Sequence, residues 1–263
     1  MTTFVLYMIQ GGLAKLVKDY NKIISLNISI PTILFTPTLH ILAGLYGFSA
    51  STFLHEIYVR EIYEQLPQYR PQSGWIIVDA GANIGLYTLL ATHVNPKTVI
   101  ALEPDPRNYL RLCRNLRINR ISGVKALPYA LASTNRCCDF VLAGDLFHSH
   151  MAEKVADQKA IKVRAVSLDY ILATFKLDHV DLLKLDVEGG EHDIITLQNK
   201  ALASGLVERI VGELHGRKYD IYALIEKLKA LDFRVELLQN AETFPTIHAR
   251  HALKTLGQET QNI

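Results

Sequence analysis

One short stretch, residues 76–88, constrains the fold of this chain more than any other part of the sequence. An apolar run there ends in Asp79, a glycine-rich loop follows at once, and an amphipathic pattern typical of a helix begins after the loop. The next apolar run, residues 98–102, is followed by a second acid, Glu103. In open α/β sheets, ligands lie beyond the carboxyl ends of the strands. Two carboxylates and a glycine loop at that edge therefore predict a ligand site.

The spacing of the loop indicates the kind of ligand. Gly81, Asn83 and Gly85 do not reproduce the G-x-G-x-x-G spacing that places a pyrophosphate on a helix N-terminus. Two carboxylates suit a ligand that carries positive charge and ribose hydroxyls but no phosphate. These properties indicate S-adenosylmethionine, whose amino group and sulfonium are cationic. A nicotinamide-dependent (NAD) oxidoreductase is the alternative, and it would need a phosphate-binding loop.

Strand and helix patterns alternate along the rest of the chain, which predicts a mostly parallel sheet covered on both faces. In the helix after the second strand, Asp105 is expected to cap the N-terminus, with Pro106 in the first turn. Strands are expected at 75–79, 98–102, 123–129, 180–185, 208–214, 233–238 and 247–253, and helices at 55–66, 84–94 and 217–231.

This alternation also predicts the domain organisation. With 263 residues, 49% of them hydrophobic, the chain is large enough for one α/β domain with a short extension. We expect the catalytic domain over residues 55–253 and a polar tail over 254–263. Within the domain, a β-rich insertion is expected at about 131–166, with strands at 137–143 and 161–166.

The N-terminal residues 1–54 are the most ambiguous part. No Asp, Glu, Lys or Arg occurs from Ile23 to His55, a length that would suffice for a membrane-spanning helix. However, Pro31 and Pro37 interrupt this segment, and it contains several polar residues. Short apolar pieces between prolines predict short strands or an irregular cap that packs on the sheet and helps to close the ligand site. A membrane-spanning helix and peripheral membrane contact are the alternatives.

Charge and cysteine content bear on partners and location. The formal net charge of +2 favours no particular partner, and we expect no nucleic-acid binding, which would need a clustered basic surface. Cys113, Cys137 and Cys138 are odd in number and include an adjacent pair, which suits a reducing compartment better than a disulfide framework. Because a signal-peptide pattern is also lacking, we expect a cytoplasmic protein. The oligomeric state is left open.

Five segments in chain order resemble the FkbM family of S-adenosylmethionine-dependent methyltransferases. They are V-D-A-G-A-N-I-G-L-Y-T, A-L-E-P-D-P-R-N-Y-L-R-L-C-R-N-L-R-I-N, S-L-D-Y-I-L, D-L-L-K-L-D-V-E-G-G-E and I-V-G-E-L-H, and the resemblance covers roughly residues 53–238. It implies the class I methyltransferase fold, a Rossmann-like three-layer α/β sandwich around a seven-stranded, mostly parallel sheet. It also implies methyl transfer to a hydroxyl oxygen, often of a sugar or a natural product. Residues 1–50 match no feature of the family.

The donor-binding residues are expected around the glycine loop. Asp79 would anchor the amino-acid end of the donor, directly or through water, and Glu103 would accept both ribose hydroxyls. Gly81 and Gly85 would let the backbone approach the donor closely. Asn83 would either cap the following helix or contact the donor's carboxylate. Further donor contacts are expected from Asn108, from Ala130, whose backbone would meet the adenine, and from Asp186.

The acceptor side of the site is expected where strands 180–185 and 208–214 end. An alkyl hydroxyl is too weak an acid to ionise alone, so a base must take its proton in or near the transition state. Glu188 and His215 are the two candidates, the second because an imidazole titrates near neutral pH. Glu213 would orient His215. Alignment of the reacting atoms would itself contribute to the rate.

Other outcomes stay open from the sequence. The ligand types of Asp186, Glu188, Glu213 and His215 would suit a divalent metal, but we expect no metal. The acceptor is expected to be a small molecule or a glycan, and transfer to nitrogen is an alternative to transfer to oxygen. A methyltransferase-like binding module without turnover is a further alternative, against which the intact acids and glycines speak.

Overall fold

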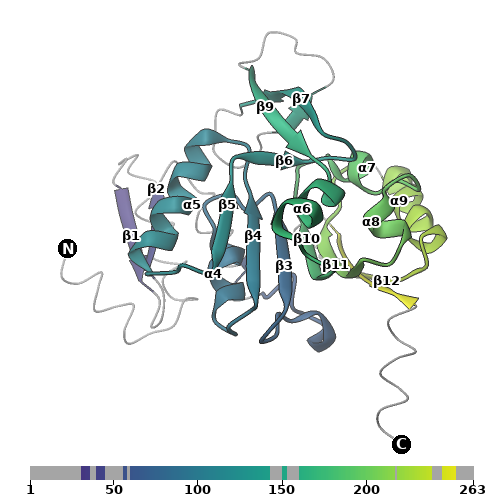
Figure 1. Cartoon of the computed structure of the whole chain (residues 1–263), viewed down its shortest axis with the longest axis horizontal. Coiled ribbons are helices and arrows are strands. Elements are labelled where there is room, and N and C mark those ends of the chain that lie inside the picture. Colours follow the sequence, from purple (N-terminus) through teal and green to yellow (C-terminus); the bar gives the residue numbers. More distant parts are fainter. Residues whose placement is uncertain are drawn as a thin grey trace, which may run out of the picture.

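A seven-stranded sheet forms the centre of the described part of the chain (Figure 1). The computed structural model describes residues 31–35, 40–44, 56–57, 60–142, 150–152, 160–216, 218–238 and 245–252. The strands of the sheet are β3 (Ile76–Ala80), β4 (Thr98–Leu102), β5 (Val124–Leu127), β10 (Val180–Leu185), β11 (Val207–Glu213), β12 (Phe233–Leu238) and β13 (Thr246–His251). Their order is β12-β13-β11-β10-β3-β4-β5, with β13 antiparallel to both neighbours and the other pairs parallel. The expected mostly parallel sheet is confirmed.

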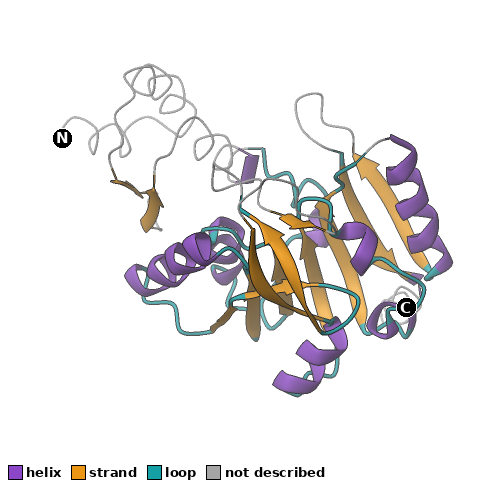
Figure 2. Ribbon diagram, turned by 90° about the horizontal axis from the view of Figure 1, so that it is seen from above, coloured by secondary structure: helices purple, strands orange, loops and turns teal. Residues whose placement is uncertain are grey.

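Helices pack on both faces of this sheet (Figure 2). Successive residues of a strand point to opposite faces: Ile77 packs in one apolar cluster with Leu89 and Leu112, and Val78 packs in the other with Ile171. Because both faces are buried, the central strands are continuous apolar runs, and each such buried side chain contributes about 1.5–3 kcal/mol. The first cluster involves α4 (Leu86–Thr92) and α5 (Pro106–Ile118), and the second involves α6 (Leu168–Phe175), α8 (Lys200–Ala203) and α9 (Lys218–Ala230).

Residues 60–66 differ from the sequence prediction. They form turns and bends, and a short 3-10 helix follows at Pro67–Tyr69, so the helix expected over 55–66 is wrong there. Glu61 has a φ of +49°, a left-handed conformation that a right-handed helix does not accommodate. Ile62 and Tyr63 are buried and hold this irregular segment on the core.

A second, four-stranded sheet is built from the segment between β5 and α6. It consists of β6 (Tyr129–Leu131), β7 (Arg136–Val141), β8 (His150–Ala152) and β9 (Ala160–Val166) in the order β6-β9-β7-β8. The single strand expected at 123–129 is therefore divided between two sheets. Pro128 stands at the division, and because proline has no N–H to donate, it interrupts a strand ladder.

The described N-terminal residues form a hairpin of β1 (Pro31–Phe35) and β2 (His40–Gly44), which pair antiparallel. The backbone of β2 lies beside α5 (Figures 1 and 2), so short strands are found where proline-separated strands were expected. The remainder of the 1–54 extension and the 254–263 tail lie outside the described residues. No helix in the described ranges combines the length and the apolar character needed to cross a bilayer.

Candidate active site

The loop after β3 is shaped by its contacts with the protein. Gly81 has a φ of +73°, and a Cβ there would lie 1.7 Å from the carbonyl oxygen of Asp186. Gly85 has a φ of +92°, and a Cβ there would lie 2.6 Å from Leu112 Cδ1. Besides the predicted close approach to a ligand, these glycines let the loop pack against Asp186 and α5.

Glu103 lies beneath this loop and joins it to the loop after β4. The backbone N–H of Asn83 donates to Glu103 Oε2 at 2.7 Å, and that of Asp105 donates to Oε1 at 2.8 Å. Burial raises the pKa of Glu103 to about 8, although both hydrogen bonds act in the opposite direction. Asn83 does not cap α4, whose N-cap is Gly85 without a side-chain cap; its side chain accepts from the N–H of Ile84.

Asp79 is wholly buried and interacts with the protein itself. Lys184 Nζ lies 3.2 Å from Asp79 Oδ1 and 3.5 Å from Asp186 Oδ2, and it donates to the carbonyl oxygen of Gly81 at 2.8 Å. Thr88 donates to the other oxygen of Asp79. Although burial would lower the pKa of Lys184, the two aspartates raise it, so the lysine stays charged. Asp79 was expected to anchor the donor directly or through water; the carboxylate that lines the pocket is that of Asp186.

A pocket opens at this point, at the carboxyl edge of the sheet. The hydroxyl of Tyr63 donates to Asp186 Oδ2 at 3.0 Å, and its ring meets that of Tyr87 edge-on at 5.4 Å between centroids. Sequence reasoning missed Tyr63, which lies 123 positions before Asp186. It also missed Lys184, whose charge near the end of a mostly apolar strand was an available signal. The pocket is lined by Ile57, Gly81, Ala82, Asn83, Leu86, Tyr87, Lys184 and Asp186.

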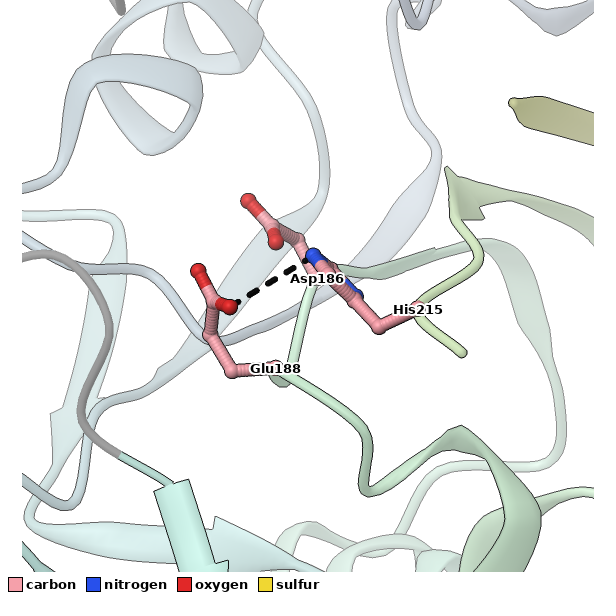
Figure 3. Close-up of side chains that lie close together, drawn as sticks. All are labelled: Asp186, Glu188 and His215. Carbon is pink, nitrogen blue, oxygen red and sulfur yellow. Dashed lines mark ion pairs between the residues drawn. The ribbon is translucent and has the colours of Figure 1, made fainter. Parts of the chain in front are cut away.

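A second group of polar side chains lies after β10 and β11. His215 Nδ1 is 2.9 Å from Oε1 of Glu191, which is fully buried in the first turn of α7 (Glu191–Ile194). His215 Nε2 is 3.6 Å from Glu188 Oε2 (Figure 3). Burial would lower the pKa of His215, but Glu191 and the other nearby carboxylates raise it to about 9. The imidazole is therefore protonated near neutral pH, which makes it a poor base in this state.

Two of the three predicted catalytic residues, Glu188 and His215, come together with Asp186, which was predicted to contact the donor. Asp186, Glu188 and His215 each present an atom within 4.8 Å of those of the other two (Figure 3). Glu188 has a left-handed φ of +51° and Gly189 one of +96°, which turns the chain sharply toward α7. Glu213, at the end of β11, is buried. Its burial and, as a smaller effect, the charge of Asp186 raise its pKa to about 8.

Two predicted donor contacts lie elsewhere. Asn108 is buried in α5. Ala130 lies in β6, is paired with Ala165 of β9, and packs in the small apolar cluster of the second sheet. Like Asp79, Gly85 and Glu103, neither of these residues lines the pocket.

Comparison with known proteins identifies the family. Residues 79–235, more than half of the chain, match the Methyltransferase FkbM domain. Methyltransferase 1 of Beauveria bassiana (strain ARSEF 2860) is 29% identical over 211 residues, which cover 70% of this chain and 81% of that protein. Hexuronic acid methyltransferase AglP of Haloferax volcanii is 26% identical over 172 residues, 64% of this chain and 68% of that protein.

A solved structure shows the same fold. The FkbM methyltransferase from Methylobacillus flagellatus KT has a TM-score of 0.54 and 18% identity, and the match covers 76% of this chain but only 51% of that longer chain. The seven-stranded sheet with its helices on both faces is thus the class I methyltransferase fold. With more than half of its length matching the family model, the chain belongs to the FkbM family of methyltransferases.

Proposed function

We propose that this chain transfers a methyl group from S-adenosylmethionine to a hydroxyl group of a small molecule or glycan. Membership of the FkbM family supports methyl transfer. The observation that carries the choice of donor is the pocket between the Gly81–Asn83 loop and Asp186, at the edge of the sheet where α/β proteins bind ligands.

The residues around the pocket fit a cationic nucleoside. Asp186, which is partly exposed, presents a carboxylate that would hold the donor's amino group, and Asp79 would act on it through Lys184. Each oxygen of Glu103 accepts one backbone hydrogen bond and keeps a lone pair for a ribose hydroxyl. When bound, S-adenosylmethionine supplies an electrophilic methyl group on a positively charged sulfur. The chain's own residues hold and orient the reactants.

The acceptor side is assigned to Glu188 and His215, with Glu213 as a buried carboxyl group near His215. Glu188 is the group through which the hydroxyl loses its proton, because 22% of its side chain is exposed and its carboxylate faces His215. His215, anchored by Glu191, fixes the position of Glu188 and carries positive charge near it.

The loop argues against a dinucleotide ligand. The backbone N–H of Asn83, a group that could contact a phosphate, donates instead to Glu103.

Calorimetry with S-adenosylhomocysteine and with NAD tests the proposal. Wild type should bind the first ligand and not the second. Asp186→Asn should bind S-adenosylhomocysteine at least tenfold more weakly, about 1.4 kcal/mol, whereas the control Asp139→Asn, at an exposed ion pair with Lys162, should bind like wild type. Binding of NAD alone would reverse the choice of donor.

Transfer itself is tested with a donor labelled in its methyl group and a panel of hydroxylated acceptors. The relative named as a hexuronic acid methyltransferase makes hexuronic acids sensible first members of that panel. Methylation at oxygen supports the proposal. Methylation at nitrogen would change the acceptor class, and donor binding without turnover on any acceptor would favour a silent binding module.

A further inference from the structure

Three side chains near the pocket form a set with metal-ligand chemistry. Asp186 follows β10, Glu188 lies in the next turn and His215 follows β11, and their ligand atoms lie within 4.8 Å of one another (Figure 3). Atoms bound to one ion at about 2.1 Å lie roughly 3 to 4.2 Å apart. Small side-chain movements would therefore close this set around a cation.

The orientation of His215 is a second, independent observation. Its Nδ1 is held by the fully buried Glu191 at 2.9 Å, which turns Nε2 toward Glu188. Metal-binding histidines almost always have their other ring nitrogen held by a carboxylate, a carbonyl or a water in this way. A histidine with only a packing role would not need to present Nε2 to two carboxylates.

The acids of the cluster outnumber the cations near them. Lys184 is shared between Asp186 and Asp79, and His215 is shared between Glu188 and Glu191. Glu191 Oε2 is buried and accepts no hydrogen bond from any described residue. Both contacts of Asp186, from Tyr63 and from Lys184, use Oδ2, which leaves Oδ1 for a further ligand. A cation among these groups would balance their charge.

We propose that Asp186, Glu188 and His215 bind one divalent cation, best matched by Mn²⁺, which displaces the proton from His215 Nε2. Carboxylates suit Mg²⁺ and Mn²⁺, whereas an imidazole suits transition metals, and Mn²⁺ meets both preferences. This inference replaces the expectation of a metal-free site. Glu213, which the sequence offered as a fourth group with suitable ligand chemistry, lies outside the set and is a nearby buried carboxyl group.

The cation also suggests the substrate class. Three protein ligands on a six-coordinate ion leave positions for an acceptor that offers two oxygens, such as a vicinal diol or a hydroxy acid. The ion would lower the pKa of the bound hydroxyl, as it does for bound water. Because Glu188 would then be a ligand of the ion, the proton would pass to solvent instead of to Glu188. This step rests on the proposed methyl transfer, whereas binding of the ion does not.

The test is titration of the metal-depleted full chain with MnCl₂, followed by calorimetry and by the paramagnetic resonance signal of free Mn²⁺. We expect one ion per chain in wild type, and at least tenfold weaker binding in Glu188→Gln and His215→Gln. Glu226→Gln, at an exposed pair on α9, should bind Mn²⁺ like wild type. No stoichiometric binding to wild type, or equal affinity in Glu188→Gln, would overturn the site.

Parallel titration with S-adenosylhomocysteine separates the two proposals. Glu188→Gln should retain its affinity for this nucleoside, which shows that the variant is folded when its Mn²⁺ affinity falls. Mn²⁺ binding without nucleoside binding would support the metal site and contradict the proposed donor. Nucleoside binding without Mn²⁺ binding would support the proposed donor and contradict the metal site.

Discussion

Replacing Glu103 by glutamine separates two effects of this buried carboxyl group: its effect on how stability depends on pH and its proposed contribution to donor binding. Burial raises its pKa from the ordinary 4.5 to about 8, against the opposing effect of two backbone N–H donors. A carboxyl group that binds its proton more tightly in the folded than in the unfolded chain makes the free energy of unfolding fall as pH rises between those values. At about 1.4 kcal/mol for each pH unit, this loss amounts to at most about 5 kcal/mol by pH 8.

Glutamine cannot ionise, so Glu103→Gln should remove this contribution. In urea titrations we expect the variant to be about 1–3 kcal/mol less stable than wild type near pH 5, because its amide group can accept only one of the two backbone hydrogen bonds that Glu103 accepts. The difference should then shift in favour of the variant by several kcal/mol as pH rises to about 9. Glu226→Gln, with an exposed side chain, should follow wild type throughout. A difference between Glu103→Gln and wild type that does not change with pH would refute the reasoning.

The same variant tests the ligand role of Glu103. A glutamine side chain offers one acceptor oxygen in place of two, so it cannot accept both ribose hydroxyls. Affinity for S-adenosylhomocysteine should fall at least tenfold, about 1.4 kcal/mol, in calorimetry. Unchanged affinity would remove Glu103 from the donor site while leaving its pH effect on stability intact.

Two further substitutions test the structural part of the site. Lys184→Met leaves two carboxylates near the pocket without their cation and should lower the free energy of unfolding by about 3–5 kcal/mol. The control Lys229→Met, at an exposed lysine, should change it by less than about 1 kcal/mol. Equal effects of the two substitutions would contradict the proposed role of the Lys184 ion pairs. Gly81→Ala forces a Cβ onto the carbonyl of Asp186. In urea denaturation it should lower the free energy of unfolding more than Gly189→Ala does. The Cβ of Gly189→Ala meets open space, so that variant should lose only about 1–2 kcal/mol, because of its left-handed backbone.

Local patterns predicted the regular elements well. The bounds of β10 are those expected, because a run of apolar residues buried on both faces is distinctive. The cap of α5 was also predictable: Asp105 accepts a hydrogen bond from the N–H of Arg107, and Pro106 occupies the first helical position. The helix over 55–66 was wrong because the burial of Ile62 and Tyr63 depends on distant partners, not on helical periodicity.

The arrangement of the candidate site was predictable in outline. Parallel strands end at the same edge of a sheet, so the acids that follow β3, β4 and β10 had to gather there. Their individual partners were not predictable. Lys184 pairs with Asp79, and Tyr63 donates to Asp186, across long separations in sequence. These contacts leave Asp186 rather than Asp79 beside the pocket.

Residue order along this chain was enough to establish its sheet and the edge where its acids gather, because strand periodicity, capping and turn chemistry act between near neighbours. The protonation of Glu103 and His215, and the convergence of three metal-ligand side chains, appeared only once the chain was folded. Such properties depend on burial and on charges contributed by remote segments, which close packing in three dimensions creates and local sequence does not specify.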